Sequence, residues 1–418
     1  MAMHSKNSKS SSPSTKKMDS EIADDMYPYL RTYKDGRVER LAVSAFVPAS
    51  EEPGATGVAT RDVVVDPGTG VSVRLFLSVA AAATGRRLPL IVYFHGGSFC
   101  TGSAFSKLFH RYAASLSARA GALVVSVDYR LAPEHPVPAA YDDAWSALQW
   151  VASLSDPWLA SYADPTRVFL AGESAGGNIV HNVAVRAGGT PNGYGIDMNG
   201  LIILQPFFWG TERLPSEATG SALPMFAPER VDTLWPFVTA GTAGNDDPRL
   251  CPRAERVACL PCRRALVSVA TKDVLRDRGR RYAEWLRDGE WCREVTLVES
   301  EGEDHGFHLI RPARATAVAL MDRVVEFIHG SAPTSLIGDA ETENLHAGEG
   351  MNKACREAWP SGSSKNTFRC QSSTVLAIAP AKPRASSFGL MLGRYGSSKL
   401  VHQFAPAALG TPVANSFL

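Results

Sequence analysis

A serine at position 174 stands in a sequence context that is typical of a catalytic nucleophile. It is the central residue of Gly172-Glu173-Ser174-Ala175-Gly176, which follows a short apolar run at residues 168–171 and precedes a segment of helical periodicity. In that strand–turn–helix order, Gly-x-Ser-x-Gly makes a tight turn whose glycines let the backbone pinch and push the serine outward. A serine hydroxyl also needs a base to take its proton, a carboxylate to orient that base, and donors for the developing oxyanion.

Asp273 is the first candidate for the carboxylate. It follows an apolar run at residues 265–270, which places it at the carboxyl end of a predicted strand. Open α/β sheets carry their sites along that edge, and in folds with this serine turn the acid precedes the histidine. Asp277, one helical turn further on, is the second candidate. Either aspartate could instead cap a helix or pair with the arginines at positions 276, 278 and 280.

His305 is the first candidate for the base. It lies in the loop at residues 299–308, just after a predicted strand at residues 295–298, so the loop could project its imidazole back toward the serine. His308 lies nearer the next helix and competes for the same role. The order along the chain, serine then aspartate then histidine, favours a catalytic triad of Ser174, Asp273 and His305.

Donors for the oxyanion are predicted in a glycine-rich loop. The segment His95-Gly96-Gly97-Ser98 follows an apolar run at residues 90–94. Backbone N–H groups of Gly96, Gly97 and Ser98 could approach a substrate oxygen, joined by the N–H of Ala175 after the nucleophile. In other enzymes the loss of one such donor raises the barrier by roughly 3–4 kcal/mol. The alternative is an ordinary Gly-Gly turn.

Short apolar runs must position these groups. They lie at residues 90–94, 123–127, 168–171, 201–204, 266–270 and 295–298, and helical stretches such as 141–154 and 282–286 separate most of them. Continuous apolar strands are typical of a parallel sheet covered by helices on both faces. Two β-rich runs at 62–65 and 71–77, the second alternating apolar with polar or small residues, predict an antiparallel hairpin at its leading edge. Residues 313–329 predict a final helix. We therefore predict a single α/β domain.

Two further segments are predicted to form a cap over the site. Residues 27–47 alternate aromatic, aliphatic and charged side chains, and residues 207–262 form a long insert, of which 207–240 would contribute to the cap. The insert could equally be an additional surface helix or two. Residues 1–17 are predicted to be a disordered leader, 18–330 the folded domain, and 331–418 a low-complexity, disordered tail.

Composition narrows the class of protein and its partners. The chain has 418 residues, 45% of them hydrophobic, and a formal net charge of +1, which favours a large core and argues against a nucleic-acid-binding surface. No apolar run approaches the roughly 20 residues that span a bilayer, and the N-terminus lacks the apolar core of a secretory signal. Seven scattered cysteines favour a reducing compartment, so we predict a cytoplasmic protein. Cys259-Leu260-Pro261-Cys262 has zinc-site spacing without a second pair, so no metal is predicted.

Several of these segments together resemble plant carboxylesterases, which belong to the hormone-sensitive-lipase-like group of α/β-hydrolases. The resemblance rests on residues 90–99, 126–136, 168–181 and 301–308 and extends over roughly residues 18–330. It implies an α/β-hydrolase fold, Ser174 as nucleophile, Asp273 as acid and His305 as base. It further implies hydrolysis of short-chain carboxylic esters without a cofactor, and oxyanion donors at Gly97, Ser98 and Ala175. We interpret Asp128, Arg130 and Glu134 as a structural motif that holds the floor of the site through buried ion pairs.

One residue departs from the family pattern. The family's loop usually reads His-Gly-Gly-Gly, whereas the last position here is Ser98. The same His-Gly-Gly-Ser is familiar in gibberellin receptors, which share the fold and have lost the catalytic histidine, so a hormone-binding protein is the alternative from another functional class. Retention of His305 favours catalysis. A third possibility keeps the triad but transfers the acyl group to an internal hydroxyl and forms a lactone.

Overall fold

The structure is a computed structural model that describes residues 21–190, 197–218, 226–291, 293–330 and 374–378. The predicted leader at residues 1–17 lies outside the described residues, as does most of the predicted tail. No helix within the described residues has the length and apolar character needed to cross a bilayer.

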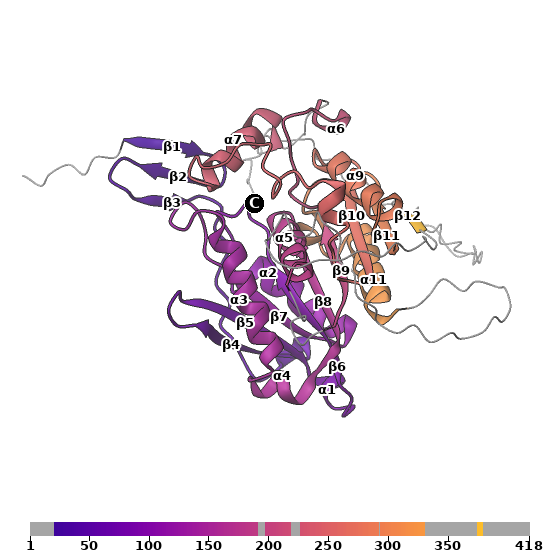
Figure 1. Ribbon diagram of the computed structural model, residues 1–418. Helices are drawn as coiled ribbons and strands as arrows, with labels where there is room; N and C mark the ends of the chain where they lie inside the picture. Colours follow the sequence, from indigo (N-terminus) through magenta and orange to yellow (C-terminus); the bar gives the residue numbers. More distant parts are fainter. Residues whose placement is uncertain (1–20, 191–196, 219–225, 292, 331–373, 379–418) are drawn as a thin grey trace, which may run out of the picture.

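A nine-stranded sheet forms the centre of the described chain, in the order β12-β11-β10-β9-β8-β6-β7-β5-β4 (Figure 1). Strands β6 to β12 pair in parallel, and β5 pairs antiparallel with both β4 and β7. This confirms the mostly parallel sheet with antiparallel leading strands. The strands are β4 (Val58–Asp66), β5 (Val71–Ser78), β6 (Leu88–Phe94), β7 (Leu123–Asp128), β8 (Ala163–Glu173), β9 (Met198–Leu204), β10 (Arg264–Ala270), β11 (Glu294–Ser300) and β12 (Thr374–Ile378).

Helices cover both faces of this sheet because its strands are apolar on both faces. Along β6, Leu90, Val92 and Phe94 face one layer of helices, whereas Ile91 and Tyr93 face the other. The first layer contains α3 (Ala139–Ser153), α5 (Ala175–Gly188) and α9 (Arg276–Asp288), and the second contains α2 (Lys107–Ala120), α10 (Phe307–Ile310) and α11 (Ala315–His329). Shorter connecting helices are η1 (Gly54–Thr56), α1 (Val79–Ala82), α4 (Pro157–Tyr162), α6 (Pro215–Ala218) and α8 (Ala254–Val257).

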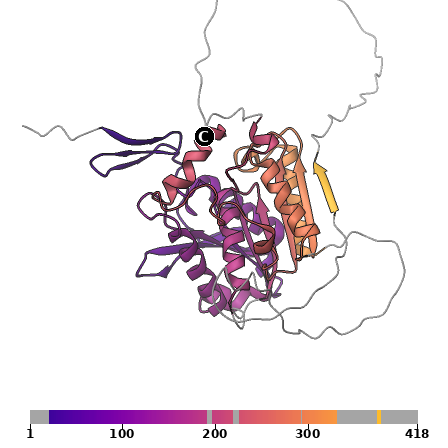
Figure 2. The same ribbon diagram turned by 45° about the horizontal axis from the view of Figure 1, so that its top comes forward.

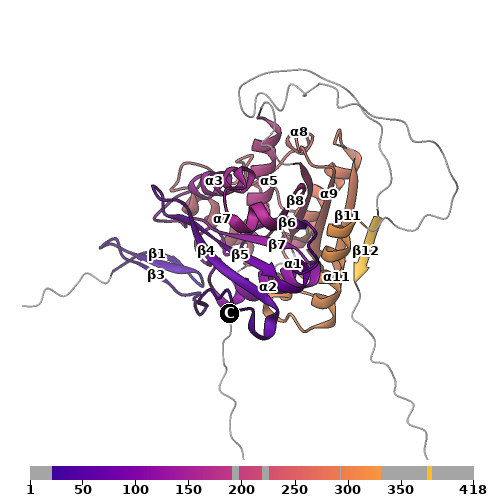
Figure 3. The same cartoon turned by 90° about the horizontal axis from the view of Figure 1, so that it is seen from below.

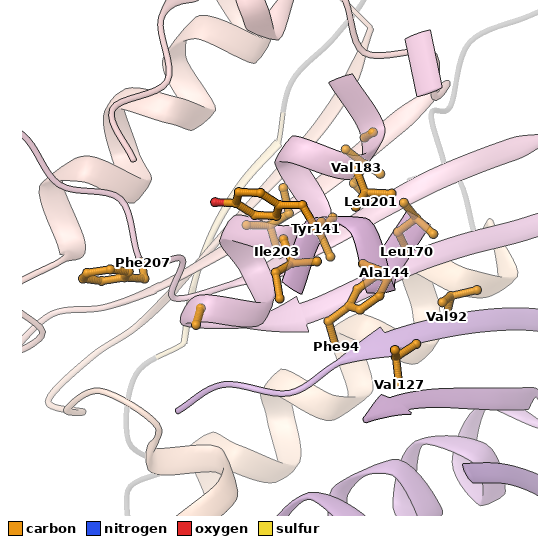
Figure 4. Close-up of a cluster of buried hydrophobic side chains, with 14 of the residues drawn as sticks. Val92, Phe94, Val127, Tyr141, Ala144, Leu170, Val183, Leu201, Ile203 and Phe207 are labelled. Atoms are coloured by element: carbon orange, nitrogen blue, oxygen red, sulfur yellow. The ribbon is translucent and has the colours of Figure 1, made fainter. Parts of the chain in front are cut away.

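The core beneath the first helical layer is continuous with the floor of the predicted site. Figure 4 shows side chains of neighbouring strands, among them Leu170 and Ile203, gathered against Ala144 of α3 and Val183 of α5. All four are fully buried. Truncating a leucine in such a setting costs roughly 2–5 kcal/mol. The strand ends that carry the predicted catalytic residues are therefore held by a rigid core.

The N-terminal segment forms a second, three-stranded antiparallel sheet. It contains β1 (Ile22–Met26), β2 (Leu30–Tyr33) and β3 (Val38–Arg40), and Gly36 makes the tight turn between β2 and β3 with a φ of 85°. The sheet extends from the body of the molecule beside α7 (Pro228–Val238), a helix of the predicted insert (Figures 1 and 2). The two segments that the sequence predicts as a cap therefore lie together.

One strand was not expected from the sequence. Residues Thr374–Ile378, within the predicted tail, form β12 and pair in parallel with β11 (Figure 3). Figure 3 shows β12 at one edge of the sheet and β4 toward the other. The strand is short and the sequence around it has no sustained hydrophobic periodicity, so no pattern indicated a strand here.

Candidate active site

Ser174 lies in a strained turn between β8 and α5. Its φ is 55° and its ψ is −119°, a conformation that is rare for a residue with a side chain. The turn needs its two glycines because a Cβ on Gly176 would lie 1.9 Å from the carbonyl oxygen of Phe94, and one on Gly172 would lie 2.5 Å from the backbone of Gly176. The sequence prediction of a tight serine turn is thus reproduced in three dimensions.

The backbone of Ser174 is fixed by the neighbouring strand β9. Its N–H donates to the carbonyl oxygen of Leu204 at 3.0 Å, and its carbonyl oxygen accepts from the N–H of Phe207 at 2.9 Å. Ser174 is 8% exposed. Both contacts come from the end of β9 and the turn after it, so that segment sets the position of the hydroxyl.

Asp273 and His305 meet at the carboxyl ends of β10 and β11. The Nδ1 atom of His305 lies 2.7 Å from Oδ2 of Asp273, and because an ionised carboxylate can only accept, Nδ1–H is the donor. The other oxygen of Asp273 accepts from the N–H of Leu275 at 3.0 Å. Asp273 is 3% exposed, so this hydrogen bond is shielded from water and fixes the orientation and tautomer of the imidazole.

The two competing candidates are placed elsewhere. Asp277 accepts from the Ser216 N–H at 2.7 Å and pairs with Arg276 at the same distance, which is the structural role considered as its alternative. His308 is buried beside the ring of Tyr112, and neither of its ring nitrogens has a partner among the described residues. Burial lowers the pKa of His308 to about 3, so the ring is neutral.

Further contacts hold the loop that carries His305. The Gly302 N–H donates to Oγ1 of Thr271 at 2.8 Å, and the carbonyl oxygen of Glu303 accepts from the Lys272 N–H at 2.9 Å. The ring of Phe226, from the insert, lies 4.5 Å from the His305 ring, centroid to centroid. The imidazole is therefore bounded by its own loop, by Asp273 and by an aromatic ring of the cap.

Residues at the end of β9 contact both the Ser174 turn and the loop that carries His305. The Gly306 N–H donates to Oε1 of Gln205 at 2.6 Å, and Gln205 directly follows Leu204, the acceptor for Ser174. The side chains of Ser174 and His305, both of them described, do not hydrogen-bond to each other in this structure. Such bonds are often long in a free enzyme and tighten when substrate binds.

The glycine-rich loop lies against the serine turn. A Cβ on Gly96 would lie 3.3 Å from that of Ser174, and Gly97 has a φ of 110° at a point where a Cβ would collide with Thr101. Ser98 adopts a φ of 57° although it is not glycine. The Gly96 N–H donates to Oε1 of Glu173 at 2.6 Å, so this amide is already engaged and is removed from the predicted oxyanion donors.

The amides of Gly97, Ser98 and Ala175 remain as candidate oxyanion donors. None of the three donates to another group within the described parts of the chain. The Ser98 side chain lies beside the hydroxyl of Tyr29, a residue of the N-terminal segment. The serine that replaces the usual glycine thus contacts the cap.

Glu173 is an unusual carboxyl group directly before the nucleophile. It is 2% exposed and accepts from the Tyr93 hydroxyl at 2.6 Å as well as from the Gly96 amide. Burial raises the pKa of Glu173 to about 8, because the charged form would lose its hydration. At neutral pH the group is therefore mostly protonated, and it joins the serine turn to the glycine-rich loop without adding a negative charge beneath the site.

Polar contacts attach the cap to the domain. Nε of Arg40, at the end of β3, donates to the carbonyl oxygen of Cys100 at 2.9 Å, and its guanidinium forms a bidentate pair with Glu134 at 2.7 and 2.8 Å. Arg230 of α7 donates to the carbonyl oxygen of Tyr27 at 2.7 Å. These contacts join both cap segments to each other and to the loop that carries the candidate oxyanion donors.

The three residues interpreted as a structural motif make separate contacts rather than shared buried ion pairs. Asp128 accepts from the Ala104 N–H at 2.9 Å, Arg130 pairs with the buried Asp143, and Glu134, 42% exposed, pairs with Arg40. The structural interpretation holds, but only Asp143 among the ion-pair partners is buried deeply. The sequence did not reveal this because Asp143 and Arg40 lie outside the motif.

The cysteine pair with zinc-type spacing is not part of a larger group of metal-ligating side chains within the described residues. No group of three or more His, Cys, Asp or Glu side chains is placed to hold an ion there. Cys262, one member of the predicted zinc-type spacing, is a buried thiol, and burial raises its pKa to about 12.

Two residues of the site have roles that the sequence analysis did not assign. Glu173 lies inside the serine motif, where its type could have indicated a partner in the glycine-rich loop. Gln205 follows the apolar run at residues 201–204, and its position at a strand end beside the nucleophile strand was the available signal. Their contacts to Gly96 and Gly306 depend on the three-dimensional arrangement.

Comparisons with protein families and with known proteins identify the family to which the chain belongs. Residues 91–309 match the model of a family described as the alpha/beta hydrolase fold. The chain is 42% identical over 331 residues to tuliposide A-converting enzyme 1, chloroplastic, of Tulipa gesneriana, covering 77% of this chain and 82% of that protein. It is 40% identical over 337 residues to 2-hydroxyisoflavanone dehydratase of Glycyrrhiza echinata, covering 77% and 99%.

A third relative and two solved structures agree with this placement. "Probable carboxylesterase 4, mitochondrial" of Arabidopsis thaliana is 41% identical over 322 residues, covering 74% of this chain and 84% of that protein. A hyperthermophilic esterase of the archaeon Pyrobaculum calidifontis matches with a TM-score of 0.55 and 27% identity, covering 65% and 85%. An esterase of Mycobacterium marinum matches with a TM-score of 0.56 and 30% identity, covering 67% and 83%. The chain belongs to the α/β-hydrolase fold family and, within it, to the plant carboxylesterases.

Proposed function

We propose that the protein hydrolyses short-chain carboxylic esters through Ser174, His305 and Asp273. The observation that carries the proposal is the 2.7 Å contact between His305 Nδ1 and the buried Asp273, at the sheet edge where Ser174 lies in its strained turn. A hormone receptor would have no need for an imidazole oriented in this way. The retained pair therefore favours catalysis over hormone binding.

The reaction proceeds in two steps. His305 Nε2 takes the proton of the Ser174 hydroxyl as Oγ bonds to the ester carbonyl carbon, and the amides of Gly97, Ser98 and Ala175 donate to the oxyanion. The bond to the alcohol then breaks, and His305 returns the proton to the leaving oxygen. Water, activated by the same imidazole, attacks the acyl-enzyme and releases the acid and the free serine.

We expect the cap to limit the length of the acyl chain that the site accepts. The Phe226 ring lies against the His305 ring, and Tyr29 of the N-terminal segment lies beside the Ser98 side chain. The Cβ and hydroxyl of Ser98 narrow the space beside the donors relative to glycine. We therefore expect acetyl and butyryl esters to be better substrates than long-chain esters.

Hydrolysis of a short-chain aryl ester, combined with a serine-directed phosphonate label, tests the proposal. Ser174→Ala should abolish turnover and labelling, whereas Ser153→Ala, at the exposed end of α3, should leave both unchanged. Mapping the label to a serine other than Ser174 would reject the assignment. Unchanged turnover in Ser174→Ala would do the same.

Intramolecular transesterification is a second candidate. It is supported by the similarity to enzymes named for converting tuliposide A, and by the fact that an acyl-enzyme can be attacked by a hydroxyl of its own acyl chain as well as by water. Product analysis with an ester of a 4-hydroxy acid separates the two reactions. Free acid indicates hydrolysis, and a lactone indicates internal transfer.

A cytosolic location is also proposed, and it rests on N-terminal composition alone, because Cys259 is disulfide-bonded and the cysteines therefore do not support a reducing compartment. The relatives named above include proteins whose names carry chloroplast and mitochondrial locations. A fluorescent fusion to the C-terminus of the full chain tests this proposal, and accumulation in an organelle would overturn it.

A further inference from the structure

Gln205 occupies the turn that follows β9, between the strand of the nucleophile and the strand of the acid. The sheet order at this point is β8, β9, β10, β11, so Ser174, Gln205, Asp273 and the His305 loop follow four successive strands (Figure 1). The loop that carries His305 leaves β11 and must pass β10 and β9 to bring its imidazole to Ser174. Gln205 is where that loop meets β9.

The contact between Gln205 and the loop is short and partly buried. Gln205 is 1% exposed, and its Oε1 accepts from the Gly306 N–H at 2.6 Å. Gly306 directly follows His305 and has a φ of 68°, a left-handed conformation that glycine adopts without strain before the short helix α10. Without Gln205 this amide would lose its acceptor in a partly buried position, which is unfavourable for the observed conformation of the loop.

The orientation of the Gln205 amide is determined by this contact. Reversing it would turn Nε2 toward the Gly306 N–H, placing two donors against each other. In the observed orientation Nε2 is buried and has no partner among the described residues. An unpartnered donor destabilises the fold, so the single contact through Oε1 is retained at some cost in stability.

The backbone of Gln205 is strained as well. Its φ of 44° lies in the left-handed region, which is unfavourable for a residue with a side chain. Its N–H donates to the carbonyl oxygen of Ser268 in β10 at 2.7 Å. The residue before it accepts from Ser174, and Phe207, two residues later, donates to Ser174. One strained turn therefore contacts the nucleophile through its backbone and the histidine loop through its side chain.

We propose that Gln205 is a positioning residue for the catalytic base, which through the Gly306 amide holds the His305 imidazole within reach of Ser174. The inference rests on the proposed function. The loop's other contacts to the chain after β10, at Gly302 and Glu303, precede His305, whereas Gln205 fixes the chain immediately after it. Losing this contact removes the hydrogen bond that fixes the peptide between His305 and α10, so the imidazole is then positioned by the Asp273 contact and by the packing of α10 further along the chain.

Steady-state kinetics with three variants test the positioning role. Gln205→Met keeps the unbranched length and removes the acceptor, Gln205→Glu keeps an oxygen acceptor in either protonation state, and Gln149→Met makes the same change at an exposed position of α3. Since a misplacement of about 1 Å can cost about 100-fold in rate, we expect Gln205→Met to lower kcat by about 10- to 100-fold with KM changed less than about threefold. Gln205→Glu should recover most of kcat, and Gln149→Met should match the unchanged protein.

A second measurement does not depend on turnover. In Ser174→Ala protein, the low-field proton resonance of the His305–Asp273 hydrogen bond reports the position of the imidazole. Adding Gln205→Met should broaden or remove it, whereas adding Gln149→Met should leave it in place. An unchanged resonance, or equal kcat in Gln205→Met and the unchanged protein, would overturn the positioning role. Failure of Ser174→Ala to abolish turnover would instead reject the proposed function, while the resonance would still test Gln205.

Discussion

Replacing Glu173 by glutamine should remove a loss of stability that the unchanged protein suffers as the pH rises. The pKa of Glu173 is about 8 in the folded chain, against an ordinary value of 4.5. Between these pH values the folded state keeps the proton and the unfolded state releases it. The folded state therefore loses stability as pH increases, with the full contribution present below 4.5 and lost by about pH 8.

The size of the effect follows from the two pKa values. The difference between about 8 and 4.5 corresponds to about 5 kcal/mol, at about 1.4 kcal/mol for each pH unit. The glutamine side chain in the Glu173→Gln variant carries no titrating proton. Its amide oxygen can accept from Gly96 and its NH2 group can donate to the Tyr93 oxygen, so both contacts of Glu173 have a replacement.

Urea unfolding followed by tryptophan fluorescence at several pH values between 5 and 9 measures this directly. The free energy of unfolding of Glu173→Gln, minus that of the unchanged protein, should rise by about 1.4 kcal/mol per pH unit between pH 5 and 8 and then level off. Taking the difference cancels all other titrating groups. Tyr93→Phe provides a second background for the same comparison. Tyr93 holds the pKa of Glu173 lower than burial alone would, so in Tyr93→Phe protein the stability difference caused by Glu173→Gln should level off at a higher pH.

Parallel stability profiles for Glu173→Gln and the unchanged protein would refute this reasoning. They would mean that Glu173 is ionised at neutral pH despite its burial. The description of the site would then have to include a negative charge beneath the oxyanion donors, where it would oppose the proposed chemistry.

Three further predictions concern the turn, the cap and the acid. Gly176→Ala should lower the melting temperature far more than Gly177→Ala. The added Cβ would lie 1.9 Å from a carbonyl oxygen in the first variant but 3.2 Å from its nearest neighbour in the second. Equal melting temperatures would contradict this. Arg40→Ala should make limited proteolysis within residues 21–47 about fivefold faster, since the partly exposed ion pair with Glu134 contributes roughly 1 kcal/mol. An unchanged cleavage rate would show that other contacts hold the cap. Asp273→Asn should lower kcat by about 10⁴-fold because it reverses the imidazole tautomer, whereas Asp277→Asn should retain most activity. A larger loss in Asp277→Asn would assign the role of the catalytic carboxylate to Asp277.

The fold and the placement of the catalytic candidates could be predicted because strand ends carry them. Continuous apolar runs identify buried parallel strands, and parallel strands bring their carboxyl ends to one edge. Ser174, Asp273 and His305 each follow such a run, so their convergence at that edge follows from topology before any coordinates are known. The distance between Asp273 and His305 is the quantity that only the structure supplies.

The supporting contacts could not be predicted because they depend on backbone geometry. Gln205 reaches the His305 loop only because its φ of 44° turns the side chain at the end of β9, and no local pattern encodes that angle. Glu173 meets Gly96 across two neighbouring strands, a pairing that depends on their register. The attachment of the cap through Arg40 joins positions 94 residues apart, at Arg40 and Glu134.

The short strand β12 affects how the molecule behaves toward other copies of itself. It pairs along β11 from Thr296 to Ser300 and so occupies backbone groups that would otherwise face solvent at the end of the sheet. Exposed strand edges are templates for pairing between molecules and for aggregation. A shorter protein that ends at Gly330 would present β11 as an open edge, so solubility and self-association, rather than catalytic rate, are where the loss of those distant residues should first become visible.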